Sequence, residues 1–251
     1  MFYTDNRKSE VFSVCPDLTA APAMPVGFAT GEHFDLLVFS PAWRAGDVFQ
    51  GDSHTVVRSR GTGCEEILTP TQKIGWVCTG LTGGVLDSVL CAAGLDCPRM
   101  LFLDQAMPLS GAELTPGLVV PNKTIYGGDA LEWLERSPFS TQEGLEVRRT
   151  PPRGVLWVNK AAYQQGIRTS TRTVLSCETR LAAAGLENQA QALGAEAADC
   201  YSALFSRCMM KLGRNGASLL VVPGEEGAEA ILRQQVCPLL LRLSEERQRA
   251  A

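Results

Sequence analysis

Short apolar runs bounded by glycine, proline or polar residues recur along the chain, which is typical of buried strands in an α/β sheet. Stretches with apolar residues at helical spacing alternate with these runs. The runs predict strands at 34–40, 73–79, 99–104, 118–121, 154–159 and 218–222, and a hairpin over 54–68 around Gly61-Thr62-Gly63. The helical spacing predicts helices at 85–94, 173–184, 189–212 and 226–247. The alternation predicts parallel strand pairing.

These elements predict one α/β domain over residues 34–251 of the 251-residue chain. Residues 1–33 contain three prolines and no periodic pattern, so we expect an irregular N-terminal arm. Residues 136–153 are rich in Ser, Thr, Pro and Arg and predict an exposed loop.

The composition excludes several classes of protein. Hydrophobic residues make up 45% and charged residues 20%, which excludes a disordered chain and a coiled coil. The net charge of −4 and the lack of a basic run argue against a nucleic-acid partner. No apolar run reaches the ~18 residues of a membrane helix, so we expect no membrane partner.

The nine cysteines are scattered, without a C-x-x-C pair, and the chain has only two histidines. We therefore expect no metal site, no cofactor, and reduced cysteines in a cytoplasmic protein.

Residues that directly follow the strands are candidates for ligand binding, because ligands of parallel sheets bind at the carboxyl ends of strands. Those candidates are Thr79, Gly80, Gly83, Gly84, Gln105, Asn159 and Tyr163. The glycine loop at 80–84 can present backbone N–H groups to an anion. The simpler alternative is a tight turn from strand to helix that needs glycine.

Three acids are candidates for catalysis. Asp104 ends the predicted strand at 99–104, and Glu225 follows the strand at 218–222. Asp199 lies in an alanine-rich, apolar stretch, where an unpaired carboxylate is costly. Both Asp199 and Glu225 also have a non-catalytic interpretation. Asp199 can lie on a solvated helix face, and Glu225 can stabilise the dipole of the following helix from its first turn.

Three stretches, read together, resemble the nucleoside phosphorylase and nucleosidase superfamily. Residues 79–84 (TGLTGG) resemble its T-G-I-G loop, 114–121 (LTPGLVVP) its L-x-P-G-D-V-V-V-P strand, and 194–203 (GAEAADCYSA) its G-A-x-A-V-D-M-E-S-A motif. The resemblance covers roughly 34–245. It implies a central mixed sheet, partly closed into a barrel and flanked by helices, and a homo-oligomer between dimer and hexamer.

The chain departs from the family at most of its polar signature positions. The Glu that holds the ribose hydroxyls in the family corresponds to Tyr201, and the Asp of the P-G-D strand corresponds to Leu118. The family has a Ser-Asp acid after its sixth strand, and the nearest acid at that place in this chain is Glu225. The family's glycine-rich turn after the third strand corresponds here to a stretch that begins with Asp104. Cleavage of an N-ribosidic bond needs groups that stabilise a cationic sugar, activate the nucleophile and protonate the base.

The resemblance therefore implies a divergent relative that acts on or binds a nucleoside-like N-glycoside with a rearranged site. Asp199, Glu225 and Asp104 are the candidate acids, and Cys200 and Tyr201 are expected at the ligand. The alternatives are an inactive pseudoenzyme or assembly subunit of this fold, and an unrelated α/β small-molecule enzyme.

Any activity is expected to be hydrolytic, because Asp104 would repel phosphate. The basic residues nearest the site in sequence, Arg44, Arg58 and Arg60, are more ordinary as surface residues.

The resemblance also changes the prediction for the stretch around Asp199. Residues two apart on a helix point about 200° away from each other, so Asp199 and Tyr201 cannot share a pocket from a regular helix. We therefore expect extended backbone at 197–200, with a helix that begins near Tyr201 or Ser202, instead of one continuous helix over 189–212. Asp199 is then expected near 79–84 or 159–163.

Overall fold

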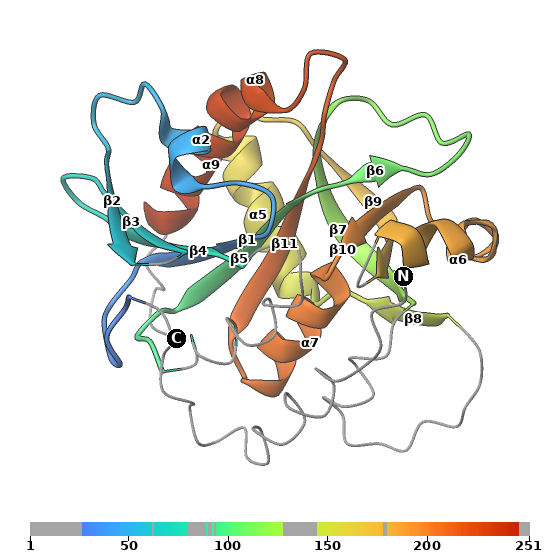
Figure 1. The fold of residues 1–251 in the computed structure, drawn as a ribbon, viewed down its shortest axis with the longest axis horizontal. Helices are drawn as coiled ribbons and strands as arrows, with labels where there is room; N and C mark the ends of the chain where they lie inside the picture. Colours follow the sequence, from blue (N-terminus) through green and yellow to red (C-terminus); the bar gives the residue numbers. More distant parts are fainter. Residues whose placement is uncertain are drawn as a thin grey trace, which may run out of the picture.

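An eleven-stranded mixed sheet runs through the centre of the molecule, with helices on both faces (Figure 1). The computed structural model describes residues 27–61, 63–79, 89, 92, 94–127, 145–177 and 180–245. The strands are β1 Leu36–Ser40, β2 Val56–Gly61, β3 Cys64–Leu68, β4 Lys73–Cys78, β5 Arg99–Gln105, β6 Met107–Pro108, β7 Gly117–Tyr126, β8 Glu146–Arg149, β9 Thr169–Cys177, β10 Ala197–Cys200 and β11 Asn215–Val222. The helices are α2 Ala45–Phe49, α5 Pro152–Gln164, α6 Arg180–Ala192, α7 Ser202–Lys211, α8 Glu229–Ile231, the π-helical turn η1 Leu232–Val236, and α9 Cys237–Glu245.

The strand order is β2-β3-β4-β1-β5-β11-β7-β9-β10-β6, and β8 pairs with β7 outside this path. β1 lies between β4 and β5 and is parallel to both, and β11 is parallel to β5. β7 is antiparallel to β11, whereas β9 is parallel to β7 and β10 to β9. The predicted parallel pairing is confirmed for the first group of strands, and the antiparallel β7 makes the sheet mixed.

The sheet curls back on itself without closing completely. Its last strand, β6, follows β5 along the chain after a single residue, Ala106. β6 pairs with β10, and the Ala106 N–H donates to the Val221 carbonyl of β11. The carboxyl end of β5 is therefore brought against β10, although these strands are far apart in the strand order. This confirms the expected sheet that is partly closed.

Alternating strand residues build a large apolar core on each face of the sheet, and a third, smaller cluster lies against α6. On one face, α7 packs Phe205 between Phe39 of β1 and Phe102 of β5, with ring centroids 5.7 Å and 5.5 Å apart. On the other face, α2, α5, η1 and α9 cover a second core. Figure 1 shows α7 below the strands and α2 and α8 above them. The α7 face is the one that carries the polar residues discussed below.

Two sequence predictions are wrong in the second half of the chain. The run 154–159 is part of α5, not a strand: Pro152 suits a first helical turn, and Val158, Ala161 and Ala162 form one buried helical face. The run at 173–184 is not one helix. β9, rich in Thr, Val and Ser, ends at Cys177, and α6 follows from Arg180.

The loop predicted at 136–153 is also corrected, because it contains β8 and the start of α5. The other predicted strands are confirmed, with β7 and β11 longer than expected. Residues 1–26 of the expected arm, Gly80, Gly83, Gly84 and most of the helix expected at 85–94 lie outside the described residues. Among the helices that the structure describes, none is long and apolar enough to cross a membrane.

Gly154 tests the packing of α5 on the sheet. A Cβ at this position would overlap the carbonyl oxygen of Gly216 and approach Ala217 Cβ within 3.3 Å. Overpacking of this kind costs about 1–3 kcal/mol, which exceeds the roughly 1 kcal/mol that alanine gains over glycine in a helix. We expect Gly154→Ala to lower the free energy of unfolding in urea denaturation.

The matched control is Gly46→Ala in α2, where a Cβ meets nothing within 4 Å. This variant is expected to be neutral or slightly stabilised. Equal stability of both variants would contradict the close packing of α5 against β11.

Candidate functional site

The junction between β10 and α7 has the geometry expected from the family resemblance. β10 ends at Cys200, Tyr201 adopts a left-handed conformation (φ 77°, ψ −1°), and α7 begins at Ser202. The predicted extended backbone at 197–200 and the helix start at Ser202 are confirmed, so the continuous helix over 189–212 is wrong. The Tyr201 N–H donates to the Cys177 carbonyl at 3.2 Å, which holds the turn against β9.

The Asp199 carboxylate, at the end of β10, accepts hydrogen bonds from the first residue of α7. One carboxylate oxygen accepts the Ser202 N–H at 3.0 Å, and the other accepts the Ser202 hydroxyl at 2.8 Å. Ser176 of β9 completes the cluster, because its Oγ accepts the Ala203 N–H at 3.1 Å. These bonds satisfy N–H groups that a helix start would otherwise leave unpaired. They explain why the helical pattern is interrupted at Asp199.

The Asp199 carboxyl is buried, with 3% of its surface exposed. Burial raises its pKa to about 6, although the hydrogen bonds from Ser202 and Ser176 act in the opposite direction. The interpretation of Asp199 as part of a solvated helix face is therefore wrong.

Tyr201 is the only non-glycine residue with a positive φ among the described residues. For a residue with a Cβ this conformation costs about 1–2 kcal/mol, and such strain concentrates at functional sites. Its side chain is 6% exposed and belongs to the core under α7. Cys200, the neighbour of Tyr201, is half-buried and is the register partner of Cys177.

Asp104 and Gln105 end β5 and lie close to this junction, because β6 pairs Met107 with Ala198. Strand alternation puts Asp104 on the same face as Phe102, which packs against α7. Asp104 is 5% exposed, whereas Gln105 is half-buried. The curled sheet thus brings two of the three candidate acids, Asp104 and Asp199, to neighbouring strand ends.

The other predicted site residues are not part of the β10–α7 junction. Thr79 is buried after β4, its N–H donates to the Ser40 carbonyl, and its hydroxyl has no partner among the described residues. Glu225 is exposed in the turn that follows β11. Gly80, Gly83 and Gly84 cannot be placed, since they lie outside the described part of the chain.

Asn159 and Tyr163 do not follow a strand, because both are on α5. Asn159 Oδ1 accepts the Thr169 hydroxyl at 2.9 Å, and Tyr163 is 85% exposed. α5 packs on the core opposite α7, so these two residues lie across the sheet from Asp199 and Tyr201. Of the two places expected for Asp199, the one near 159–163 is therefore wrong, and most of the other, 79–84, lies outside the described residues.

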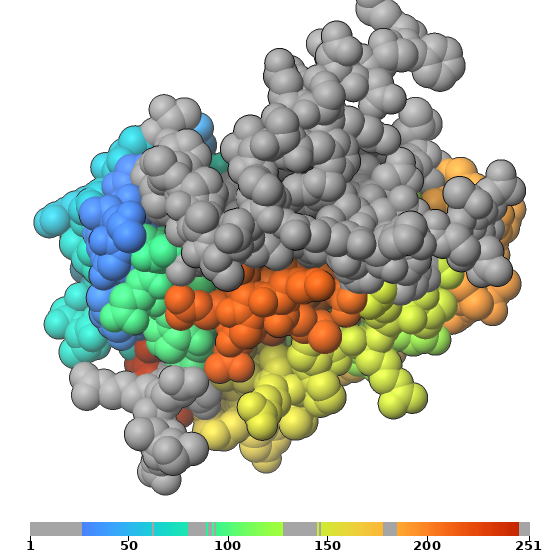
Figure 2. All heavy atoms as spheres, turned by 90° about the horizontal axis from the view of Figure 1, so that it is seen from below, coloured from blue at the N-terminus to red at the C-terminus, as the bar shows by residue number. Residues whose placement is uncertain are grey.

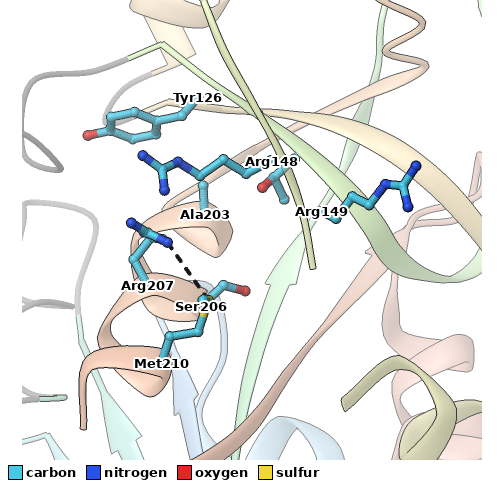
Figure 3. A pocket seen from close by; sticks show the side chains of 8 residues that line it. Tyr126, Arg148, Arg149, Ala203, Ser206, Arg207 and Met210 are labelled. Carbon is cyan, nitrogen blue, oxygen red and sulfur yellow. Dashed lines mark hydrogen bonds between the residues drawn. The ribbon is translucent and has the colours of Figure 1, made fainter. Parts of the chain in front are cut away.

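The sequence prediction missed a hollow of about 220 Å³ beside α7, which we call the arginine hollow (Figure 3). Its lining residues are Thr124 and Tyr126 of β7, Arg148 and Arg149 of β8, and Ala203, Ser206, Arg207 and Met210 of α7. Figure 2 shows α7, in orange, beside the yellow-green segment that contains β8. Burial lowers the pKa of Arg207. The signal in the sequence was the Arg148-Arg149 pair, which fell within the expected loop.

The basic residues named from the sequence serve other contacts. Arg60 pairs with Glu66 at 3.0 Å and with Glu32 at 3.2 Å. Arg58 lies on the exposed strand β2, with its guanidinium 4.0 Å from Glu66. Arg44 precedes the short helix α2. None of the three lines the arginine hollow.

Comparison with solved structures identifies the fold. AMP nucleosidase from Bacteroides thetaiotaomicron VPI-5482 matches with a TM-score of 0.63 and 10% identity over 84% of this chain and 87% of its own. Purine nucleoside phosphorylase from Toxoplasma gondii in complex with immucillin-H matches with a TM-score of 0.66 and 14% identity over 88% and 95%. A futalosine hydrolase mutant of Helicobacter pylori strain 26695 matches with a TM-score of 0.60 and 14% identity over 84% and 99%.

No protein-family model and no curated protein sequence matches the chain. The chain therefore shares the fold of these three solved structures, which is the fold that the sequence resemblance implied.

The raised pKa of Asp199 gives a pH dependence of stability with a defined sign. Because the pKa is higher in the folded protein than the ordinary 3.8, the folded state binds a proton that the unfolded state has lost. This contribution to stability is complete below about pH 4 and is lost as the pH rises through about 6. Two pKa units correspond to about 3 kcal/mol.

We expect the free energy of unfolding of the wild type, relative to Asp199→Asn, to fall by about this amount between about pH 4 and pH 7. Urea denaturation at several pH values measures it, with Glu225→Gln as a control that alters an exposed carboxylate. A pH-independent difference between wild type and Asp199→Asn would contradict the buried environment of Asp199.

Proposed function

We propose that this protein is a divergent relative of nucleosidases that binds a nucleoside-like N-glycoside at the junction of β10 and α7. The observation that carries the proposal is the strained Tyr201 at the end of β10, where the family resemblance puts the residue that holds the ribose. Two of the similar structures are named as a nucleosidase and a nucleoside phosphorylase, and the third as a hydrolase.

In this proposal the Tyr201 hydroxyl makes one hydrogen bond to a sugar hydroxyl. A phenol donates or accepts a single bond, whereas a carboxylate accepts two from a diol. The sugar is therefore held less tightly than by the Glu that the family has at this position. The buried Thr79 hydroxyl, which lacks a partner among the described residues, is a second candidate donor.

Binding without efficient bond cleavage agrees best with the arrangement of the acids. Both oxygens of Asp199 accept hydrogen bonds from Ser202, so this carboxylate is oriented toward the helix start. Glu225 is exposed in a turn. Loss of one acid–base group typically lowers a rate by 10²–10⁴, and here Glu225 is exposed while Asp199 is hydrogen-bonded to the helix start.

A second candidate function is slow hydrolysis of the same ligand with Asp104 as the acid. The observation that favours it is the burial of Asp104 at the end of β5, next to β10. A carboxylate at this strand end disfavours a phosphate nucleophile by charge repulsion, so water is the expected nucleophile.

Binding is tested by Tyr201→Phe, which removes only the phenolic hydroxyl. One hydrogen bond contributes about 0.5–1.5 kcal/mol, so we expect the Kd of a bound nucleoside, found from a panel of nucleosides by calorimetry, to rise about two- to thirteenfold. The matched control is Tyr163→Phe on α5, which is expected to leave the Kd unchanged. If no nucleoside binds the wild type, or if both variants behave alike, the proposed function is wrong.

Catalysis is tested by chromatographic detection of free base from the same nucleosides, with and without inorganic phosphate. We expect little or no release, and no acceleration by phosphate. Should hydrolysis be detected, Asp104→Asn is expected to lower its rate by about 10²–10⁴. Release that depends on phosphate would contradict both candidate functions.

A further inference from the structure

The Asp199 carboxyl, two residues before Tyr201, is buried among uncharged partners. It is 3% exposed, and the residues that hold it in the described part of the chain are Ser202 and Ser176. Transfer of an ionised carboxylate from water into a protein interior is costly unless a cation pairs with it. The proton state of this one group therefore affects how stable the closed β10–α7 junction is.

The elements packed around Asp199 do not balance its charge. On the face of the sheet that α7 covers, strand alternation and packing put these titratable residues nearest to it: Asp104 of β5, Tyr126 of β7, Arg172 of β9, Cys200 and Tyr201 at the junction, and Arg207 and Cys208 of α7. Arg172 pairs with Glu196 at 3.2 Å. None of the cations among the described residues forms an ion pair with Asp199.

Protonation rearranges the hydrogen bonds of the cluster and leaves its members paired. With Asp199 ionised, the Ser202 hydroxyl donates to the carboxylate at 2.8 Å, and the Ser176 hydroxyl donates to it as well. A proton taken from water onto the oxygen that faces Ser202 reverses the first bond, so that the carboxyl donates and Ser202 Oγ accepts. The Ser202 hydrogen can then turn to Ser176 Oγ, which lies 3.4 Å away. The neutral cluster contains no buried charge.

The same carboxyl holds the turn at Tyr201. It accepts the Ser202 N–H, and Tyr201, at φ 77°, lies between the two residues. An opening of the junction that lets water reach Asp199 returns its pKa from about 6 toward the ordinary 3.8, so by linkage a proton on Asp199 opposes that opening. The closed junction is therefore favoured below about pH 6 and loses stability as the pH rises through that value.

We propose that ligand binding at the β10–α7 junction is coupled to the uptake of a proton by Asp199. This regulation rests on the proposed function, because it concerns the same nucleoside site at Tyr201. A nucleoside that binds to the closed junction stabilises it, and such coupling is reciprocal. Protonation tightens nucleoside binding, and the bound nucleoside draws a proton onto Asp199. The junction binds its ligand more tightly in mildly acidic than in neutral solution.

The test is isothermal titration of the full chain with adenosine, inosine and uridine at about pH 5 and about pH 7.5. We expect the Kd of a nucleoside that binds to rise about fivefold or more between these two pH values, as ordinary coupling between two sites gives. At about pH 7, titration in two buffers of different ionisation enthalpy is expected to show proton uptake on binding. A Kd that does not change with pH, or binding without proton uptake, overturns the proposal.

Asp199→Asn is the matched variant, because asparagine cannot ionise and can make the bonds of the neutral acid. Its Oδ1 accepts the Ser202 N–H, and its Nδ2 donates to Ser202 Oγ. We expect this variant to bind at about pH 7.5 as tightly as the wild type does at about pH 5, without pH dependence. The same pH dependence in variant and wild type overturns the proposal.

Ser176→Ala carries the test if Asp199→Asn does not fold. It removes a donor to the charged carboxylate, so we expect the pH at which the Kd changes to move upward. The control is Ser170→Ala on the same strand, whose hydroxyl donates to the Leu118 carbonyl and which is expected to keep the wild-type profile. Equal profiles of the two serine variants contradict the coupling through Asp199.

Hydrogen exchange separates failure of this proposal from failure of the proposed function. If none of the three nucleosides binds, the proposed function is wrong, and exchange of the Ser202 and Ala203 amides tests the proton-linked closing by itself. Their protection, corrected for the intrinsic effect of pH, is expected to fall between about pH 5 and about pH 7.5 in the wild type and not in Asp199→Asn. Equal behaviour of both proteins overturns the coupling whether or not a nucleoside binds.

Discussion

The two hydrogen bonds from Ser202 to the Asp199 carboxylate hold the β10–α7 junction together, and the polar residues around α7 depend on this junction for their positions. They end β10, force Tyr201 into a left-handed turn, and start α7. Because α7 packs Phe205 against Phe39 and Phe102, its start also determines how the core on that face is covered. The same helix then carries Ser206 and Arg207 to the arginine hollow one turn further along.

The curled sheet is the second constraint. Since β6 follows β5 after one residue and pairs with β10, the end of β5 cannot move away from the β10–α7 junction without breaking that pairing. The strand ends that carry Asp104 and Asp199 are therefore held close to each other, although 94 residues separate the two acids in the sequence. A simple open sheet with the same strands would leave these acids at distant strand ends.

The sequence predicted the strands with continuous apolar runs, such as β1 and β5, because both of their faces are buried. The strand prediction for 154–159, which belongs to α5, was wrong because these six residues are apolar enough for either a strand or a helix. The helical period is visible only when Ala161 and Ala162 are included. The break at Asp199 could not be read from periodicity, because the alanines on both sides suit a helix. It came from the family resemblance alone. The arginine hollow was missed because it is assembled from β7, β8 and α7, which are distant in sequence.

The role of Asp199 follows from what a single carboxylate can do. Each carboxyl oxygen has two lone pairs, so Asp199 can accept both hydrogen bonds from Ser202 and still carry a proton, but turning the carboxyl toward a leaving group would leave the Ser202 N–H or hydroxyl unpaired in a buried site. Leaving a buried polar group unpaired costs about 1–3 kcal/mol, which is a large addition to a reaction barrier. The raised pKa shows that burial already disfavours the charged form. Asp199 is therefore better suited to fixing the position of Tyr201 than to chemistry, and the strain in Tyr201 is the direct consequence of that fixation.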